Sequence, residues 1–338
     1  MDVIFAQAIK DSTALRKASV PWNPGEPHGQ PYHAFDDAAS SWVPQHPSTD
    51  TAPTSLTSLT IYTWNIDFML PGAVARMKAA LAHLGGLTRE AAPTTAIVIF
   101  LQECTPSDLA TIAATPWVQE RFHITDVDAT NWTTTHYGTT TLVDSRLPIT
   151  AAFRVQYPQT RMDRDALFVD VSLGPRGTRT RLCNTHLESM ALDPPFRPAQ
   201  MQLVARYLHE AHVDAALAAG DFNAIQPFDR TLHVDDGNNL KDAFLELGGK
   251  EDSDEGFTWG QQAPTELRTR FGCSRMDKVY FCGRVEVVRL ERFGQDVVVA
   301  GEEECTQIVA LGCEKPWVTD HLGVLAGVRV VSCQMRND

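Results

Sequence analysis

The chain has 338 residues, of which 43% are hydrophobic and 21% charged, as expected for a globular protein that buries a large core. Its formal net charge of -13 argues against a protein that coats nucleic acid through non-specific electrostatics, but allows an enzyme that binds a phosphodiester at a local site. The seven cysteines include no CxxC pair, which favours reduced thiols over a disulfide framework or a zinc site. Because no segment has the apolar length of a secretory signal or a membrane span, we expect an intracellular protein.

The first segment, residues 1–56, is rich in Pro, Ser, Thr, Asp and Ala and shows no sustained periodicity. This composition predicts a mostly irregular N-terminal arm. Three aromatic residues within it, Tyr32, Phe35 and Trp42, lead to the hypothesis that part of the arm packs on the domain formed by residues 57–338.

From residue 59 onward, predicted strands alternate with predicted helices. Residues 59–64 and 95–102 are short runs rich in β-branched and aromatic residues, and both predict buried strands. A helix is predicted between them, ended by the glycines at 85–86. After the second strand, Thr105 as N-cap and Pro106 at the first helical position predict another helix. The apolar face of the first helix is formed by Val74, Met77, Leu81 and Leu84.

The middle of the chain is dominated by strands, and a second round of helix and strand follows. Apolar spacing predicts a helix over residues 201–211, and the small apolar run after it predicts a strand that stops at Gly220. Further strand-like segments close the chain. Many strands with helices between them, in two rounds, predict a four-layered α/β sandwich in which two packed mixed sheets are flanked by helices.

Five polar clusters follow predicted strands. Alternation along an extended chain points Asp221 and Asn223 to the same side, and this pair alone is compatible with a simple polar turn. Five such clusters are hard to explain as turns, because functional groups collect at strand ends of layered α/β scaffolds. The clusters are Asn65 and Asp67; Glu103; Asn184, His186, Glu188 and Ser189; Asp221 and Asn223; and Asp320 and His321.

These residue types favour metal-assisted phosphoester chemistry. Glu, Asp and Asn supply hard oxygen ligands, which suit Mg²⁺ or Mn²⁺ rather than zinc, and Mg²⁺ completes its shell with water and substrate phosphate. A separate carboxylate can activate a water for in-line attack, and an Asp–His pair can stand beside an anionic transition state. The clusters therefore predict a metal-dependent phosphoester hydrolase.

The chain resembles the endonuclease/exonuclease/phosphatase superfamily in five ordered motifs between residues 63 and 321: TWN, LQE, NTHLES, GDFN and TDH. It is similar to the 5′-tyrosyl-DNA phosphodiesterases of the second type in three further segments: YPQTRMDR (157–164), FTW (257–259) and RMDKVYF (275–281). The resemblance implies a DNase I-like sandwich and a Mg²⁺-dependent enzyme, also compatible with Mn²⁺, that hydrolyses the phosphotyrosyl bond at DNA 5′ ends. It further implies a monomer that repairs topoisomerase adducts on single-stranded 5′ ends, in the nucleus or cytoplasm and away from membranes.

By position, the resemblance implies a catalytic role for most of the clustered residues. Glu103 would be the principal Mg²⁺ ligand, with Asn65 at or beside the metal. Asp221 would activate the attacking water, and Asn223 would stabilise the transition-state oxygens. The scissile phosphate would be contacted by His186 and by His321, the latter held by Asp320, with Asp277 as a supporting member. Asp67 and Glu188 are expected to be hydrogen-bonding supports.

The resemblance also implies positions that face the substrate. Matching positions in the family line the DNA groove or pack on the terminal nucleotide: Tyr137, Trp259, Ser189 and Met276. Arg275 is a further candidate, with a local ion pair as the alternative reading. Arg197, in a longer proline-rich loop after HLES, is a candidate for replacing a lost phosphate contact.

The chain departs from the tyrosyl-DNA branch at Ile225, where those enzymes carry a basic residue. This departure and the acidic charge keep other substrates of the same fold open: abasic sites, RNA or nucleotides, phosphoinositides or sphingolipids. A non-catalytic scaffold is disfavoured because the metal Glu, the water-activating Asp and the terminal His are all present. The acidic runs at 251–255 and 302–304 are expected to be solvated loops.

Overall fold

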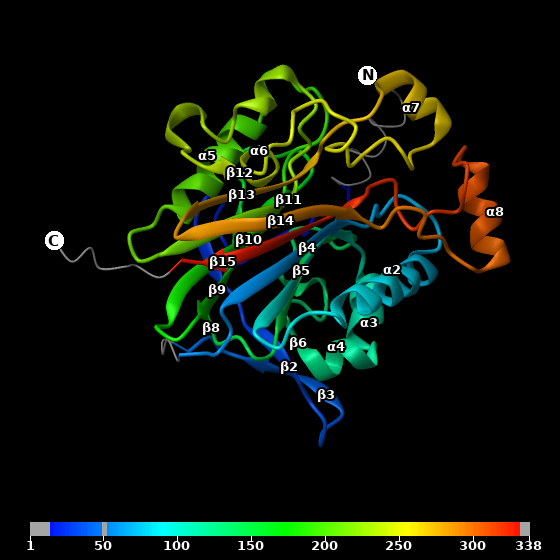
Figure 1. The fold of residues 1–338 in the computed structure, drawn as a ribbon. Coiled ribbons are helices and arrows are strands. Elements are labelled where there is room, and N and C mark those ends of the chain that lie inside the picture. The colour runs from blue at the N-terminus through cyan, green and yellow to red at the C-terminus, as the bar shows by residue number, and fades with distance from the viewer. Residues whose placement is uncertain (1–13, 49–52, 332–338) are drawn as a thin grey trace.

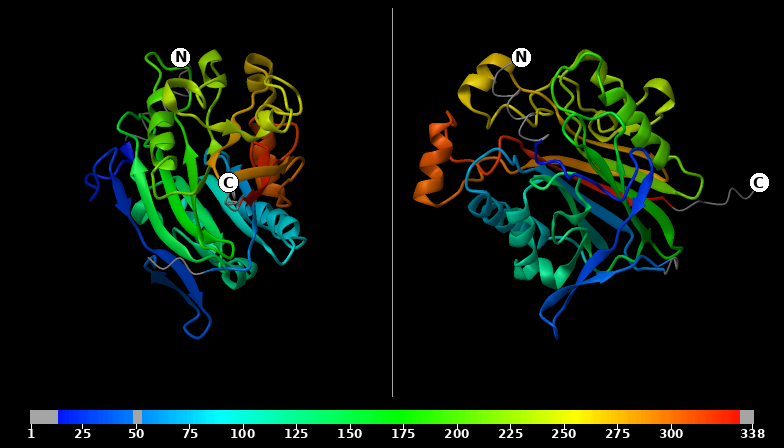
Figure 2. Two further views of the ribbon diagram at one scale, coloured as in Figure 1. Left: turned by 60° about the vertical axis from the view of Figure 1, so that its left-hand side comes forward. Right: turned by 180° about the vertical axis from the view of Figure 1, so that it is seen from behind.

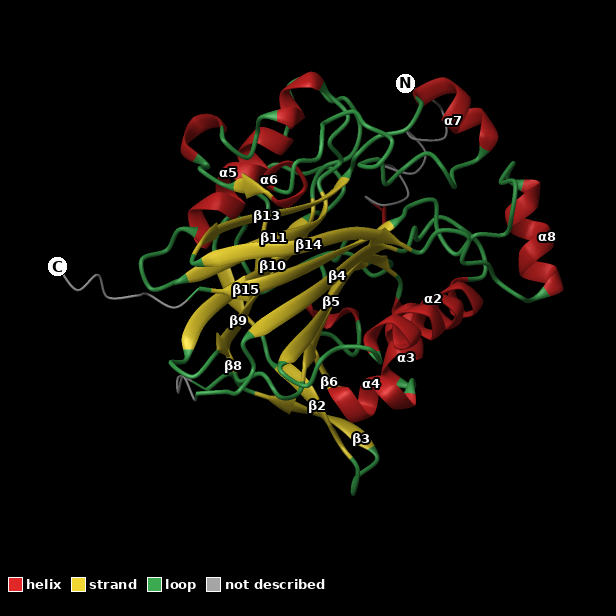
Figure 3. Ribbon diagram, in the orientation of Figure 1, coloured by secondary structure: helices red, strands yellow, loops and turns green. Residues whose placement is uncertain are grey.

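The structure is a computed structural model that describes residues 14–48 and 53–331. Two mixed β-sheets pack face to face and helices cover their outer sides, which confirms the predicted four-layered sandwich (Figures 1 and 3). The eight-stranded sheet runs in the spatial order β14 (Val285–Phe293), β15 (Gly323–Val330), β4 (Ser58–Asn65), β5 (Thr95–Cys104), β7 (Gly138–Asp144), β6 (Phe122–Ile124), β2 (Tyr32–Asp36) and β3 (Ser41–Gln45). The seven-stranded sheet runs β1 (Pro27–Gly29), β8 (Ile149–Gln156), β9 (Asp165–Leu173), β10 (Thr178–His186), β11 (Ala215–Asp221), β13 (Asp277–Gly283) and β12 (Lys241–Asp242).

The main core lies between the two sheets. Ile61 and Phe100 of the first sheet meet Leu182, Leu217 and Val279 of the second within one cluster of buried side chains. Burying a large apolar side chain contributes roughly 1.5–3 kcal/mol to the free energy of folding. Separating the sheets would lose this contribution at many positions, so the packed layer sets the distance between them. The spacing between the sheets in turn sets the distance between the functional groups that follow the strands of one sheet and those that follow the strands of the other.

Helices form the two outer layers (Figure 1). The eight-stranded sheet is covered by α2 (Ala73–Thr88), α3 (Pro106–Ala113) and α4 (Pro116–Arg121), and the seven-stranded sheet by α5 (Arg197–Leu208). The shorter helices α6 (Ala243–Glu246), α7 (Thr265–Phe271) and α8 (Glu302–Ala310) belong to connecting segments. No helix in the described part of the chain has the length and apolar character needed to cross a membrane.

Helix α3 begins as predicted. Thr105 Oγ1 accepts from Asp108 N (3.2 Å), and Asp108 Oδ2 accepts from Thr105 N (2.8 Å), which completes a capping box. The predicted end of α2 at Gly85 is wrong, because the helix continues to Thr88. A Cβ at Gly85 would lie 3.0 Å from Trp117 Nε1, so this glycine allows α2 and α4 to approach each other.

The expectation of an irregular arm over residues 1–56 is wrong for three segments between residues 27 and 45. β1 adds to the edge of one sheet beside β8, and the β2–β3 hairpin adds to the other sheet through β6 (Figure 2). Unpaired strand edges offer backbone hydrogen bonds to an extended segment whatever its composition. Trp42 packs as supposed, since its Nε1 donates to Ala113 O (2.9 Å). Residues 1–13 and 49–52 of the predicted arm lie outside the described residues.

Candidate active site

The polar clusters meet at one edge of the sandwich, where β4, β5, β10 and β11 end. In the seven-stranded sheet, His186 pairs in register with Asp221, and Asp221 pairs with Asp277 on the next strand. Residues in register on neighbouring strands point to the same face. The sheet therefore presents an imidazole and two carboxylates in one row.

The close approach of β10 and β11 at this edge depends on Gly220. Its φ is 150°, and a Cβ at this position would lie 1.8 Å from the carbonyl oxygen of Thr185. Only a residue without a side chain fits there. Gly220 thus brings His186 and Asp221, the next residues of the two strands, to hydrogen-bonding distance.

Asp221 is the centre of the network and is 2% exposed. Its Oδ2 lies 3.0 Å from Asn65 Nδ2, 3.2 Å from His186 Nε2 and 3.7 Å from His321 Nε2, while its Oδ1 accepts from the backbone N–H of Asn223 (2.8 Å). Burial alone would raise the pKa of Asp221, but the two imidazoles outweigh burial and hold it well below its ordinary value. The carboxylate therefore stays ionised and can accept a hydrogen bond that orients a water molecule.

His321 is oriented by Asp277, and the expectation that Asp320 holds it is wrong. His321 Nδ1 lies 2.8 Å from Asp277 Oδ2, whereas the nearest Asp320 oxygen is 3.8 Å from Nε2. Asp320 instead accepts a hydrogen bond from Trp259 Nε1 (2.6 Å). Burial lowers the pKa of His321, but the carboxylates of Asp277, Asp320 and Asp221 outweigh burial and raise it well above its ordinary value. An imidazolium therefore faces the centre of the site.

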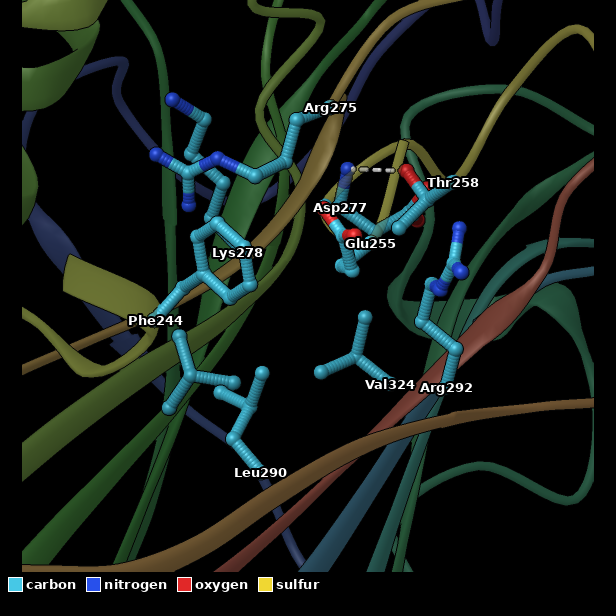
Figure 4. A pocket seen from close by; sticks show the side chains of 11 residues that line it. Phe244, Glu255, Thr258, Arg275, Asp277, Lys278, Leu290, Arg292 and Val324 are labelled. Atoms are coloured by element: carbon cyan, nitrogen blue, oxygen red, sulfur yellow. Dashed lines mark hydrogen bonds between the residues drawn. The ribbon is translucent and has the colours of Figure 1, made fainter. Parts of the chain in front are cut away.

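Asp277 is supported from behind by buried residues (Figure 4). Its backbone N–H donates to Thr258 Oγ1 (3.0 Å). The cavity at this point measures about 10 Å³, enough for about one water molecule. Arg275 also lines it, with its guanidinium paired to Asp242 (2.8 Å) and to Glu251.

His186 is held by Arg164, a residue that the sequence reasoning passed over inside the YPQTRMDR segment. Arg164 Nη1 lies 2.5 Å from His186 Nδ1. A guanidinium can only donate, so Nδ1 is the acceptor and the ring proton sits on Nε2, facing Asp221. Arg164 Nη2 also lies 3.7 Å from Glu103 Oε1. Its place inside the YPQTRMDR segment, which resembles the tyrosyl-DNA branch, was the available signal.

Oxygen ligands gather beside this network. Glu103 Oε2 accepts from Phe68 N (3.1 Å), and Asn65 Oδ1 accepts from Asp67 N (2.9 Å). Burial and the carboxylates of Asp320 and Glu103 raise the pKa of Asp67 well above its ordinary value. Crowded carboxylates of this kind fit a hard divalent cation, which would relieve their repulsion.

This all-oxygen set suits Mg²⁺ or Mn²⁺. Among the described residues, no three His, Cys, Asp or Glu side chains form a complete metal cluster. Mg²⁺ does not need one, because it usually takes one or two carboxylates and completes its shell with water and phosphate. The residues present therefore fit the ion that the sequence predicts.

The segment after β4 is fixed by Arg76 of α2, which is 0% exposed. Its guanidinium donates to four backbone carbonyls: Ile66 (2.5 Å), Leu70 (3.0 Å), Pro71 (3.0 Å) and Val318 (2.7 Å). The segment that follows Asn65 and the segment that precedes His321 are thereby tied to the same side chain.

The comparison with known families agrees with this geometry. The model of the Endonuclease/Exonuclease/phosphatase family matches residues 62–321. The chain belongs to that family.

Members of the family are similar to the chain in sequence and in fold. Human tyrosyl-DNA phosphodiesterase 2 is 24% identical over 290 residues, covering 84% of this chain and 72% of that protein. Truncated Caenorhabditis elegans TDP2 has a TM-score of 0.61 and 22% identity, covering 82% of this chain and 100% of that chain. D. rerio TDP2 complexed with single strand DNA product has a TM-score of 0.59 and 18% identity, covering 80% and 99%. The resemblance inferred from the motifs is confirmed, and the protein is a hydrolase of phosphodiesters.

Two arginines expected to face the substrate of this family member do not do so. Arg197 is 2% exposed, and its guanidinium pairs with Asp229 (2.7 Å). Arg275 is 5% exposed and pairs with Asp242 and Glu251. Both expectations are wrong for the same reason: each guanidinium is already bound to a carboxylate that is distant in sequence.

The other four residues expected to face the substrate differ in their exposure. Tyr137 is 5% exposed and stacks on Phe68 (ring centroids 4.3 Å apart), with the Arg164 guanidinium 5.1 Å from its ring centroid. Met276 is buried, whereas Trp259 and Ser189 are half-buried near the edge of the site.

Asn223 and Glu188 each hydrogen-bond to a neighbouring loop of the active site. Asn223 Nδ2 donates to Leu187 O (3.0 Å), and the residue adopts φ 48°. Glu188 accepts from Thr160 Oγ1 (2.7 Å) and Arg161 N (2.8 Å), the supporting role expected of it.

The acidic runs are not simple solvated loops. Glu251 belongs to the buried ion-pair group with Arg275 and Lys278. Residues 302–304 form the first turn of α8, where acidic side chains are favoured by the helix dipole.

Proposed function

We propose that the protein hydrolyses the phosphotyrosyl bond at DNA 5′ ends with Mg²⁺, or alternatively Mn²⁺, as its ion, and so repairs topoisomerase adducts. The observation that carries the proposal is the ionised Asp221 carboxylate, held between two imidazoles and Asn65 beside the oxygen ligands. Glu103 and Asn65 would hold the metal, with Asp67 next to them. When bound, the metal supplies Lewis-acid polarisation of the phosphate.

Side chains of the protein would activate the water and stabilise the charge that develops on the phosphate. Asp221 orients a water and accepts its proton as the oxygen attacks phosphorus in line with the tyrosyl oxygen. His321, charged through its contact with Asp277, and His186, with its proton on Nε2, donate toward the phosphate oxygens as negative charge develops. Asn223 is placed beside Asp221 to contribute its polar groups to the same oxygens. The tyrosine leaves as a phenolate.

The tyrosyl-DNA assignment is supported by the named relatives and by Trp259, which is half-buried near the edge of the site. An aromatic face of this kind can stack on a single-stranded base or on a tyrosyl ring. The D. rerio TDP2 structure complexed with single strand DNA product supports single-stranded 5′ ends as the substrate. The protein would act on them as a monomer inside the cell.

A test compares substrates under identical conditions. The purified protein is incubated with Mg²⁺ and oligonucleotides that carry a 5′-tyrosyl, a 3′-tyrosyl or an abasic group, beside bis(p-nitrophenyl) phosphate. We expect the 5′-tyrosyl oligonucleotide to be cleaved fastest, and cleavage to stop when EDTA removes the metal. Preference for another substrate would contradict the tyrosyl-DNA assignment, and metal-independent cleavage would contradict the proposed ion.

One observation favours a second candidate, a phosphohydrolase of the same fold acting on another phosphoester. Ile225 is 39% exposed next to the site, where the tyrosyl-DNA enzymes carry a basic residue. A phosphoinositide or sphingolipid phosphoester in mixed micelles, added to the same series, decides between the two.

A further inference from the structure

A short N-terminal segment lies beside the loops that border the site. Residues 15–17, which we call the strap, pair with residues 133–135. Lys17 N donates to Thr133 O (3.0 Å), Thr135 N donates to Leu15 O (3.1 Å), and Arg16 forms a β-bridge with Thr134. The Lys17 ammonium also donates to Ala129 O (2.6 Å) and Thr130 O (2.9 Å). The strap therefore contacts both ends of the segment formed by residues 129–135.

Thr134, the bridge partner of Arg16, builds the turn that carries Tyr137. Thr134 is 1% exposed; its hydroxyl donates to Tyr137 O (2.9 Å) and accepts from Tyr137 N (3.3 Å). The backbone of Arg16 thus supports the turn that sets the position of the Tyr137 ring.

The side chain of Arg16 reaches a second loop. Its Nη2 lies 2.6 Å from Asp163 Oδ1, and the two side chains are 42% and 1% exposed. In the described part of the chain, Arg16 is the one residue that forms an ion pair with Asp163, and no other group donates a hydrogen bond to this carboxylate. A buried carboxylate that loses its counter-charge is strongly destabilising.

Asp163 stands directly before Arg164, which holds His186 and approaches Glu103. The two loops are also joined by Tyr137, whose hydroxyl donates to Met162 O. Arg16 therefore contacts both loops at once, through its backbone at residue 134 and through its guanidinium at residue 163.

We infer that the strap is part of the substrate site, with Arg16 as a positioning residue that holds the Tyr137 and Arg164 loops in register for the substrate. The inference deepens the proposed function and rests on it for the identity of that substrate. Without the Arg16 side chain, the Asp163 carboxylate is left buried without its counter-charge, and the backbone bridge to Thr134 loses its link to the loop that carries Arg164. Arg164 keeps its contacts with His186 and Glu103. Loss of the Arg16 side chain therefore shifts the two loops more than it changes the centre at Asp221.

The test compares Arg16→Ala, Arg16→Lys, Asp163→Asn and the Arg16→Ala/Asp163→Asn double variant. The control is Arg289→Ala, which removes an exposed ion pair with Glu291 on β14. Hydrogen–deuterium exchange is followed in residues 129–137 and 157–164, and kcat and KM are measured with a 5′-tyrosyl oligonucleotide and with bis(p-nitrophenyl) phosphate.

We expect Arg16→Ala to increase exchange in both loops and to raise KM for the oligonucleotide roughly fivefold or more, with a smaller change for the small diester. Arg16→Lys restores most of this loss. In the Asp163→Asn background, Arg16→Ala has little further effect, because the buried charge is gone. The control behaves as the unmodified protein.

Unchanged exchange in both loops of Arg16→Ala would overturn the inference, as would an equal fall in kcat on both substrates with no change in KM. If the unmodified protein does not cleave the tyrosyl oligonucleotide, the proposed function fails. The exchange data and their dependence on Asp163 still decide whether the strap holds the loops.

Discussion

Asn65 and Asp221 lie on different sheets, and the Asn65 amide donates a hydrogen bond of 3.0 Å to Asp221 Oδ2 across the top of the core. The oxygen-ligand side of the site belongs to the eight-stranded sheet, and the water-activating side belongs to the seven-stranded sheet. Packing of the two sheets therefore sets the geometry of the reaction.

Replacing the water-activating carboxylate is the most direct test of this geometry. We expect Asp221→Asn to lower kcat by about 10²–10⁴-fold, the usual contribution of a general base. The amide is similar in size, so the thermal unfolding midpoint should change little. Near-normal turnover in a folded variant would rule out Asp221 as the base.

Asp277 and Asp320 make a matched pair for testing which carboxylate orients His321. The charge of Asp277 raises the pKa of His321, and catalysis by the imidazolium is lost as the pH rises through that pKa. Asp277→Asn should therefore move the basic limb of the kcat profile to lower pH. Asp320→Asn, which removes the more distant carboxylate, should move it less. The opposite order would contradict the assignment.

The need for a glycine at position 220 can be tested by comparison with Gly174, where an added Cβ would meet no neighbouring atom. Gly220→Ala places a Cβ against the Thr185 carbonyl and should cost about 1–3 kcal/mol of unfolding free energy or more, together with much of the activity. Gly174 also has a positive φ (80°), but nothing lies within 4 Å of a Cβ there. Gly174→Ala therefore measures backbone strain alone, and denaturant unfolding of both variants separates strain from collision.

Ile225 provides a gain-of-binding test. Under the proposed function, Ile225→Lys should tighten binding to a single-stranded 5′ end and steepen the salt dependence of binding by about one phosphate contact. Val288→Lys, on β14 at 43% exposure, adds the same charge elsewhere and serves as the control. Equal effects from both lysines would show that only net charge matters.

Glu251 predicts a pH dependence of stability. Burial raises its pKa, but Arg275 and Lys278 outweigh burial and set it below the ordinary value of 4.5. A lowered pKa means that the stabilisation is present above pH 4.5 and is lost as the pH falls through the folded-state pKa. Glu251→Gln should therefore be less stable than the unmodified protein near neutral pH, with the difference shrinking in acid. A constant difference in unfolding free energy across that range would contradict this linkage.

The sequence predicted the sandwich and most of the residues that meet at its edge, because polar clusters at strand ends are a local signal. It misassigned partners that only the packing of strands decides. Asp320 is next to His321 in the chain, yet the start of β13 brings Asp277 to the imidazole. Arg197 has a carboxylate partner, Asp229, that no local pattern reveals. Arg164 lies in the YPQTRMDR segment that resembles the family, but its partner His186 is set by the packing of strands.

Arg76 gives the outer layer an unexpected part in the architecture of the site. A helix on the far side of a sheet usually contributes only its apolar face, and its other residues could be exchanged freely. Here one guanidinium passes from α2 to the segments that bear Asn65 and His321. Anyone transplanting this site onto another sandwich would have to bring that helix with it.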